Sequence, residues 1–216
     1  ATSLLNLVDE QRPDTLYRLF DALRAITSGF AIRLDQYHSS RYQMYPPQDN
    51  PRIEALQKLI KQNIGSEQAV IFCQYTQEIE DILTILGSNA VPYYGEMSQA
   101  KRHTSKMQFK DGKAQFFVAN KSCAQFGLNL QFCHNEIFYN NDWDYATREQ
   151  AEDRLHRVGQ IRDVNIYDIF AKDTIDVSIL DCLARKCSLV DAFKKELKGK
   201  NDMRATLNSV IYGKED

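Results

Sequence analysis

The chain has 216 residues, the size of one domain or of one domain with an appendage. Its formal net charge of −2, from 27 basic and 29 acidic residues, excludes a polycation that holds nucleic acid by bulk charge, so any such contact must be a local patch. With 43% hydrophobic residues the composition is that of a globular chain. No apolar run approaches the roughly 20 residues of a membrane span, so we expect no membrane partner.

The cysteines and glycines narrow the function classes further. The five cysteines are scattered, without a Cys-x-x-Cys pair or metal-spaced histidines, and the amino terminus lacks the pattern of a signal peptide. We therefore expect reduced thiols, no metal site and a cytoplasmic location. The sequence contains no Gly-x-x-x-x-Gly-Lys-Ser/Thr, the loop that cradles nucleotide phosphates. The chain thus lacks the usual part for binding a nucleotide alone.

The first 45 residues are predicted to be helical. Apolar residues from Leu16 to Phe30 recur at helical spacing, and Asp14 is the expected cap. Residues 36–51 are rich in Tyr, Pro, Ser and Asn without a period, and we interpret them as a linker.

From Asn50 onward helices alternate with short apolar runs, beginning with a helix that Asn50 caps and Pro51 opens. This alternation predicts an α/β fold with a parallel sheet flanked by helices. We expect a helical segment and linker over 1–49, an α/β domain over 50–173, and a C-terminal helix and tail over 174–216. The predicted strands are 69–73, 90–94, 115–119, 136–139 and 164–170, and helices are expected near 51–64, 79–86, 98–109, 147–157 and from 175 onward.

The most informative stretch runs from Gln150 to Gln160, QAEDRLHRVGQ. On a helix, Gln150, Arg154 and Arg157 fall on one face, which we expect close to the carboxyl end of the sheet. Guanidinium groups are fixed, permanently charged forks for phosphate oxygens, so this face suits a triphosphate. Ordinary salt bridges to neighbouring Glu and Asp residues are the alternative, and geometry alone does not separate the two.

This stretch resembles motif VI of the SNF2-type ATPases of helicase superfamily 2. The resemblance continues in the family's order through AVIFCQYTQEIEDI, resembling motif IV, FGLNLQ, resembling motif V, and NEIFYNNDW. The resemblance covers roughly residues 50–200, and it is strongest to the SNF2-like helicases of phages and prophages. The resemblance therefore implies that the protein is located in the cytoplasm of a bacterial or phage-infected cell.

The family resemblance implies a DNA-dependent ATPase with two RecA-like lobes, in which ATP and Mg²⁺ lie between the lobes. This chain is similar only to the second lobe, a RecA-like sheet without its own phosphate loop, with residues 1–49 resembling the protrusion between lobes. The first lobe is then a partner on another piece of polypeptide, most simply the rest of a larger protein. We expect this lobe alone to be inactive, without stably bound ATP, and the motor to act on DNA, most simply duplex DNA.

Site roles follow from the resemblance, position by position. Arg154 and Arg157 are expected to reach the γ-phosphate and to stabilise charge that develops during phosphoryl transfer. The implied nucleotide-binding residues are Gln150, Gly127, Asn129 and Gln160. The implied DNA-binding residues are Gln74, Tyr75, Thr76, Gly95, Arg102, Lys121, Ser122 and Trp143.

Several alternatives stay open. Ala124 and Gln125 stand where the family usually carries Gly-Gly, which puts the details of the DNA contact in question. Taken alone, Asn129 is typical of a turn, and Trp143 of packing between elements. The chain can also be a non-motor RecA-like module that binds DNA or protein. A flavodoxin-like enzyme would need a catalytic His, Ser or carboxylate pair at the strand ends, and we find no convincing one.

Overall fold

The computed structural model describes residues 13–34, 39–122 and 128–186. Its contacts divide the chain into two compact units. The larger unit comprises residues 46–142 and 146–169, and the smaller unit combines residues 1–45, 143–145 and 170–216. Among the described residues, the smaller unit brings together residues 13–34 and 39–45 with residues 170–186.

The smaller unit is built on helix α2 (Pro13–Thr27) and helix α7 (Ile175–Ala184). The Thr27 hydroxyl donates a hydrogen bond to the Asp176 carboxylate at 3.0 Å, which ties α2 to the first turn of α7. The Thr174 side chain caps α7 by accepting a hydrogen bond from the backbone N–H of Asp176. The predicted long C-terminal helix is described only as far as Ala184, and its continuation beyond residue 186 lies outside the described residues.

The prediction of helix and linker is wrong over residues 28–34 and 39–43, while residues 1–12 and 35–38 lie outside the described residues. Gly29 has a φ of 94°, in the left-handed region that favours glycine, and α2 ends before it. The chain then forms strand β1 (Phe30–Leu34), which pairs antiparallel with strand β2 (Ser39–Gln43). Phe30 keeps its predicted place in the core, but as the first residue of a strand.

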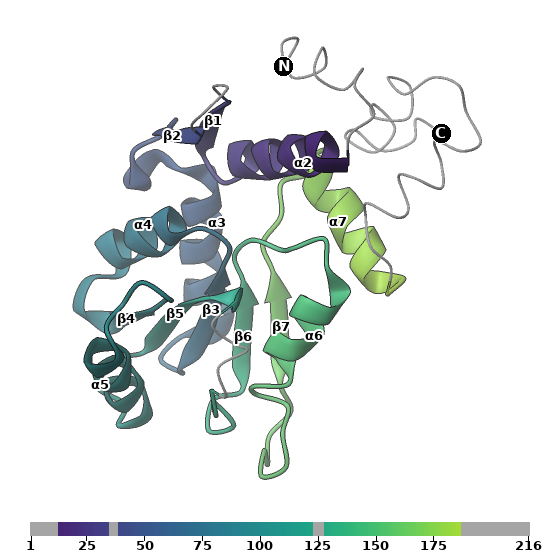
Figure 1. Ribbon diagram of the computed structural model, residues 1–216. Helices are drawn as coiled ribbons and strands as arrows, with labels where there is room; N and C mark the ends of the chain where they lie inside the picture. The colour runs from purple at the N-terminus through teal and green to yellow at the C-terminus, as the bar shows by residue number, and fades with distance from the viewer. Residues whose placement is uncertain (1–12, 35–38, 123–127, 187–216) are drawn as a thin grey trace. The chain divides into compact units, whose positions relative to one another are not determined.

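The larger unit contains a five-stranded sheet in the order β4-β5-β3-β6-β7, and every pairing in it is parallel (Figure 1). The predicted α/β class is confirmed. All five predicted strands are present, with bounds β3 (Ala69–Cys73), β4 (Ala90–Tyr93), β5 (Phe116–Asn120), β6 (Asn135–Phe138) and β7 (Asn165–Asp168).

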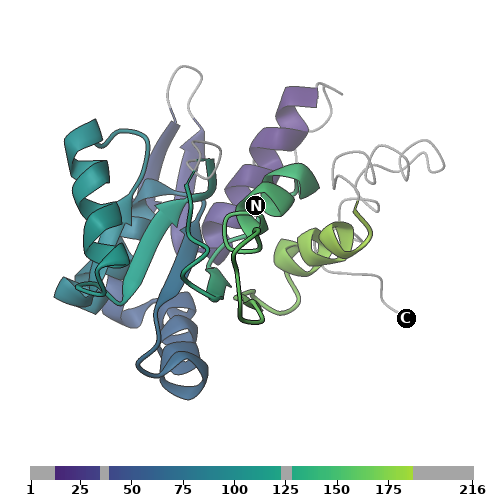
Figure 2. The same ribbon diagram turned by 90° about the horizontal axis from the view of Figure 1, so that it is seen from below.

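Helices cover both faces of this sheet (Figures 1 and 2). Apolar side chains of α3 and α4 pack on one face with Ile71, Val118 and Ile137. Those of α5 and α6 pack on the other face with Phe72 and Phe138. The bounds are α3 (Pro51–Leu59), continuing as π-helix η3 (Ile60–Ile64), α4 (Thr76–Leu86), α5 (Gln99–Lys110) and α6 (Tyr145–Glu152), with short 3-10 turns η2 (Pro47–Asp49) and η4 (Gly87–Asn89).

The local starts of these helices follow from side-chain caps. The Asn50 side chain accepts a hydrogen bond from the backbone N–H of Arg52, and Pro51 opens the helix, as predicted. Ser98 caps α5 in the same way through the N–H of Lys101. Across the described residues no helix is long and apolar enough to span a membrane.

Candidate functional site

Arg154 and Arg157 do not lie on a helix. The predicted helix over residues 147–157 ends at Glu152, and the two arginines follow it in consecutive turns. The expectation that Gln150, Arg154 and Arg157 share one helix face is therefore wrong. Within the turns, the N–H of Arg154 bonds to the carbonyl of Ala151 at 3.0 Å and the N–H of Arg157 bonds to the carbonyl of Leu155 at 3.0 Å, spacings shorter than those of an α-helix.

Beyond the helix, the backbone and side chains of the turn contact the rest of the domain. The Arg154 carbonyl accepts a hydrogen bond from the N–H of Leu130 at 3.1 Å, and the Leu155 side chain is fully buried against the sheet. Leu130 lies just before β6, so the arginine turn sits at the amino-terminal end of that strand. The predicted place close to the carboxyl end of the sheet is also wrong, because α6 runs back along the sheet before the arginines are reached (Figure 1).

The turn borders an open pocket of about 540 Å³. Among the described residues, neither Arg154 nor Arg157 forms an ion pair, so the salt bridges that the sequence left open are not formed. The Arg154 side chain donates a hydrogen bond from Nε to the Gln150 carbonyl at 3.2 Å, and Arg157 is exposed. Two such guanidinium groups beside a hollow can bind phosphate oxygens. The pocket is lined by Asn129, Gln131, Asp153, Arg154, His156, Arg157 and Val158.

The other implied nucleotide residues lie in different settings. Asn129 lines the pocket, but its side chain accepts a hydrogen bond from the N–H of Gln131 at 3.3 Å, the turn geometry that the sequence left as an alternative. Gln150 is exposed on α6. Gly127 lies outside the described residues. Their roles stay predictions.

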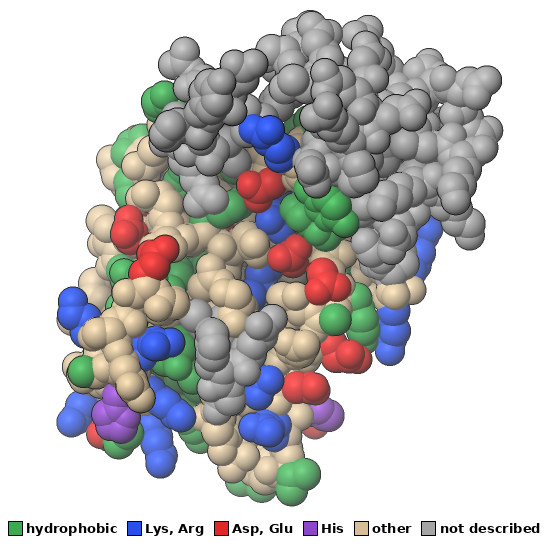
Figure 3. All heavy atoms as spheres, viewed as in Figure 1, with side chains coloured by type: hydrophobic (Ala, Val, Ile, Leu, Met, Phe, Trp, Pro, Cys, Tyr) green, Lys and Arg blue, Asp and Glu red, His purple; other side chains and the backbone are tan. Residues whose placement is uncertain are grey.

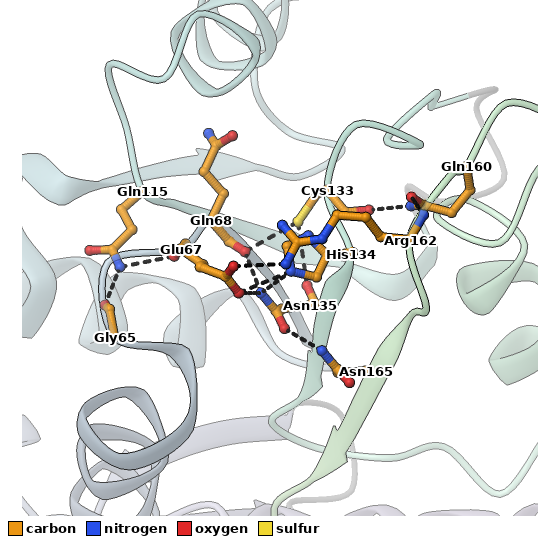
Figure 4. Close-up of polar contacts among 10 residues, drawn as sticks. All are labelled: Gly65, Glu67, Gln68, Gln115, Cys133, His134, Asn135, Gln160, Arg162 and Asn165. Carbon is orange, nitrogen blue, oxygen red and sulfur yellow. Dashed lines mark hydrogen bonds and ion pairs between the residues drawn. The ribbon is translucent and has the colours of Figure 1, made fainter.

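Gln160 anchors the loop that follows the arginines. Its side-chain amide donates to the Cys133 carbonyl at 2.8 Å, and its amide oxygen accepts from the N–H of Arg162 at 3.0 Å (Figure 4). Gly159 has a φ of 106°, which only glycine adopts readily. Val158 and Ile161 are 101% and 96% exposed, so the anchored loop presents two aliphatic side chains to solvent.

Next to this loop, polar residues meet where the strands of the sheet begin, at their amino-terminal ends (Figure 4). The Glu67 carboxylate accepts hydrogen bonds from Arg162 at 2.9 Å and from Asn135 at 3.2 Å, and it contacts the His134 ring at 2.9 Å. These hydrogen bonds, that of Arg162 first, lower the pKa of Glu67 to about 2. The network is a structural support that sequence reasoning missed, because its members are distant in sequence.

The predicted DNA-binding residues after β3 and β5 lie at the opposite side of the sheet, at the carboxyl-terminal ends of the strands. The backbone N–H groups of Gln74 and Tyr75 donate to the Glu78 carboxylate at 2.8 and 3.0 Å. Thr76 opens α4, and Ser122 donates to the Asn120 side chain at 2.6 Å. The backbone N–H groups of Gln74 and Tyr75 and the Ser122 hydroxyl thus have protein partners. A DNA role for these residues and for Thr76 stays a prediction.

Lys121 and Trp143 are placed as structural side chains. Lys121 is only 2% exposed, and its ammonium group donates to the Asn140 carbonyl at 2.6 Å. Trp143 stacks with the guanidinium of Arg24 at 4.2 Å and contacts the rings of Tyr17 and Phe20, which is the packing role left open above. Neither placement favours DNA contact.

Arg102 belongs to a basic helix that sequence reasoning did not single out. Helix α5 carries four Lys or Arg residues and no acidic residue, and within the described part of the chain none of the four forms an ion pair. Figure 3 shows Lys and Arg side chains gathered over α5, at its lower left. Gly95 lies in the turn between β4 and α5. The four are Lys101, Arg102, Lys106 and Lys110.

No cluster of metal-ligating side chains occurs among residues 13–34, 39–122 and 128–186.

Comparison with known proteins identifies the chain. Residues 51–159, just over half of it, match the family model of the helicase conserved C-terminal domain. The chain belongs to this family.

This helicase C-terminal domain is similar to curated helicases. It is 30% identical over 175 residues to "Helicase swr-1" of Neurospora crassa, covering 75% of the chain and 10% of that protein. It is 31% identical over 155 residues to "Uncharacterized ATP-dependent helicase YqhH" of Bacillus subtilis, covering 68% of the chain and 28% of that protein. The chain thus spans a small part of these relatives.

Solved structures support the same assignment. The C-terminal part of the Fun30 ATPase domain is 28% identical, with a TM-score of 0.58 over 66% of this chain and 48% of that chain. The SWI2/SNF2 ATPase core of Sulfolobus solfataricus has a TM-score of 0.60 over 94% of this chain and 41% of that chain, and at 22% identity it shows the fold. Together with the relatives, the Fun30 structure places the chain among helicase C-terminal domains of SNF2-family ATPases. Both structures confirm the RecA-like fold.

Proposed function

We propose that this chain is the second motor lobe of a DNA-dependent ATPase, in which ATP is held by the N-terminal RecA-like lobe of the same parent protein. The observation that carries the proposal is the arginine turn. Arg154 and Arg157 face an open pocket without an ion pair among the described residues, in a chain whose sequence contains no phosphate loop. Guanidinium groups that carry no carboxylate partner and border a hollow are available to bind phosphate oxygens.

In this proposal the two guanidinium groups bind the γ-phosphate of ATP held by the other lobe. They stabilise the negative charge that spreads over the phosphoryl oxygens as the bond to the leaving group breaks. Mg²⁺ is held mainly by ATP and by the other lobe. Gln150 and Asn129 stand beside the arginines and are proposed to contact the nucleotide or the facing lobe.

The anchored loop supports the presence of a facing partner. Val158 borders the same pocket as the arginines, and its side chain is wholly exposed. Gln160 and Arg162 fix this loop to the sheet edge, so the loop keeps its shape while it exposes Val158 and Ile161. A lobe that brings ATP to the arginines must cover these aliphatic side chains.

We further propose that DNA phosphates bind along α5. The chain as a whole has a charge of −2, yet α5 presents four cations and no acid on one helix. This is the local patch that the overall charge requires. Arg102 and Gly95 belong to this surface, whereas Lys121 and Trp143 are left out of it because their side chains are engaged inside the protein. Duplex DNA is the proposed substrate, and kinship with phage helicases is proposed from motif resemblance alone.

The alternative is a RecA-like module that binds DNA or protein without motor function. The basic helix α5 alone is sufficient for that role, since it needs no arginine turn. The two proposals differ in one experiment, DNA-stimulated ATP hydrolysis by the full-length protein. Loss of hydrolysis in Arg157→Ala with unchanged DNA binding supports the motor, whereas a full-length protein that binds DNA but hydrolyses no ATP supports the module.

A further inference from the structure

A buried carboxylic acid, whose role the packing of the fold does not explain, lies beneath helix α6. Glu136 is the second residue of β6, and its side chain is completely buried. Among the described residues, neither of its carboxylate oxygens forms a hydrogen bond. Burying an unpaired charge is strongly unfavourable, so such a group is expected to hold its proton.

The position of Glu136 follows from the sheet register. Glu136 and Phe138 are two residues apart and point to the same face of β6, the face that α6 covers. The guanidinium of Arg148 on α6 lies 3.4 Å from the centre of the Phe138 ring. Asp168 pairs with Phe138 in the neighbouring strand β7, and Glu152 is one turn beyond Arg148.

The charged groups that surround Glu136 come from two elements. Helix α6 supplies Arg148 and Glu152, and β7 supplies Asp168. The buried Cys133 thiol, a titratable group on the turn before β6, also lies within electrostatic reach of Glu136, while the facing residue of β3 is Val70. Burial raises the pKa of the Glu136 carboxyl group to about 8, with Arg148 opposing the shift and the two carboxylates adding to it. The cluster therefore holds one arginine among three acids, of which the buried one is protonated at neutral pH.

Arg148 connects this cluster to the arginine turn. It donates hydrogen bonds to Glu152 at 2.5 Å, to the Asn141 side chain at 2.7 Å and to Asp168 at 2.5 and 3.2 Å. Glu152 is the last residue of α6, and its carbonyl accepts from the N–H groups of Leu155 and His156. The contacts of Arg148 thus fix the helix end from which Arg154 and Arg157 follow.

We propose that Glu136 is a proton-linked positioning residue for the arginine turn. While Glu136 is protonated, Arg148 stays bound to Asp168 and Glu152, and the turn keeps its place. When Glu136 loses its proton, a bare carboxylate beneath α6 competes for Arg148 and repels Glu152 and Asp168, so the end of α6 and the turn shift. This inference rests on the proposed function for its consequence in catalysis, but its structural part stands on this chain alone.

The structural part is tested by NMR on the 216-residue chain with ¹³C-labelled glutamate carboxyl groups. The Glu136 signal, identified by its loss in Glu136→Gln, is expected to titrate close to pH 8. The backbone amide signals of residues 153–158 are expected to shift with the same midpoint, and not to do so in Glu136→Gln. A Glu136 midpoint below about pH 6, or amide signals that titrate identically in the variant, overturns the proposal.

The catalytic consequence is tested by the pH dependence of kcat for DNA-stimulated ATP hydrolysis by the full-length protein. The wild type is expected to lose activity on the order of tenfold relative to Glu136→Gln at about pH 9, since a group that titrates near 8 is then about one-tenth protonated. Glu80→Gln, an exposed site on α4, is the matched control and is expected to follow the wild type.

The Arg148 link is tested in the same assay. Arg148→Lys keeps the charge and is expected to retain a higher kcat than Arg148→Gln. In both variants the KM for ATP is expected to change less than kcat. Matching pH profiles for wild type and Glu136→Gln overturn the positioning role while leaving the proposed motor intact. Full activity of Arg157→Ala overturns the proposed function instead, and the NMR titration then still decides the structural part.

Discussion

The guanidinium of Arg148 on helix α6 meets both carboxylate oxygens of Asp168 at the end of strand β7, with the second contact at 3.2 Å. Arg148 is 8% exposed, so this ion pair is largely shielded from water. It joins the helix that precedes the arginine turn to the edge strand of the sheet. The pair is therefore a structural support of the candidate site, although neither residue borders the pocket.

The first prediction concerns the removal of this arginine. Arg148→Ala leaves Glu152 without this partner and Asp168 with the Asn141 amide. It is expected to lower the free energy of unfolding by about 3 kcal/mol, the lower end of the range for breaking a buried pair, because both carboxylates are partly exposed. Urea denaturation of the 216-residue chain measures the change. Arg102→Ala, which removes a partly exposed arginine without an ion pair on α5, is the control and is expected to change stability by less than about 0.5 kcal/mol. Equal effects of the two substitutions contradict this account.

The second prediction concerns acid stability. The Glu67 network holds the pKa of that carboxyl group at about 2, below its ordinary value of 4.5. A lowered pKa contributes stability above the unfolded value, and this contribution is lost as the pH falls from about 4.5 through 2. Glu67→Gln is expected to flatten this part of the curve of unfolding midpoint against pH. An unchanged slope between pH 5 and 2 shows that the contacts of Arg162, Asn135 and His134 do not matter to stability.

The third prediction concerns Gly159. Its φ of 106° disfavours any side chain, and an added methyl group would lie 3.1 Å from the Gln131 side chain. Gly159→Ala is expected to destabilise the chain by about 1–2 kcal/mol through backbone strain. Gly95→Ala is the control for stability, because a methyl group there meets nothing within 4 Å. A thermal midpoint for Gly159→Ala equal to that of Gly95→Ala would show that the loop adapts freely.

The fourth prediction concerns the basic helix. Replacing Lys106 and Lys110 on α5 by Gln is expected to weaken duplex binding and to reduce the slope of log affinity against log salt by about 0.9 for each lost phosphate contact. Fluorescence anisotropy at several salt concentrations measures both quantities. Lys58 pairs with Glu54 on α3, and Lys58→Gln serves as the control with an unchanged slope. An unaltered slope in the α5 double variant removes this helix from the proposed DNA surface.

The sequence predicted the sheet well because each strand is a short apolar run between helical patterns. Val70 to Phe72 are buried on both faces, as expected of a central parallel strand. It failed at residues 28–34 and 39–43, because Gly29 ends a helix whose apolar spacing continues to Phe30. Spacing counts residues but does not show that glycine has left the helical conformation.

The candidate site was predictable in identity but not in geometry. Motif spacing selected Arg154 and Arg157, and the structure brings both to one pocket with Asn129. The turn that carries them is held by a hydrogen bond between Leu130 and Arg154, which are far apart in sequence. The burial of Lys121 and the support by Arg148 depend likewise on tertiary contacts that a local pattern does not contain.

The most direct test of the central claim is the rate of ATP hydrolysis by the full-length protein with duplex DNA, for wild type and Arg157→Ala. Arg157 is exposed and unpaired among the described residues, so its loss should leave folding and the unfolding midpoint unchanged. We predict a fall in kcat of about 10³-fold or more, the lower end of the range for arginine fingers. A folded Arg157→Ala protein with wild-type kcat contradicts the assignment of this chain as the arginine-bearing lobe.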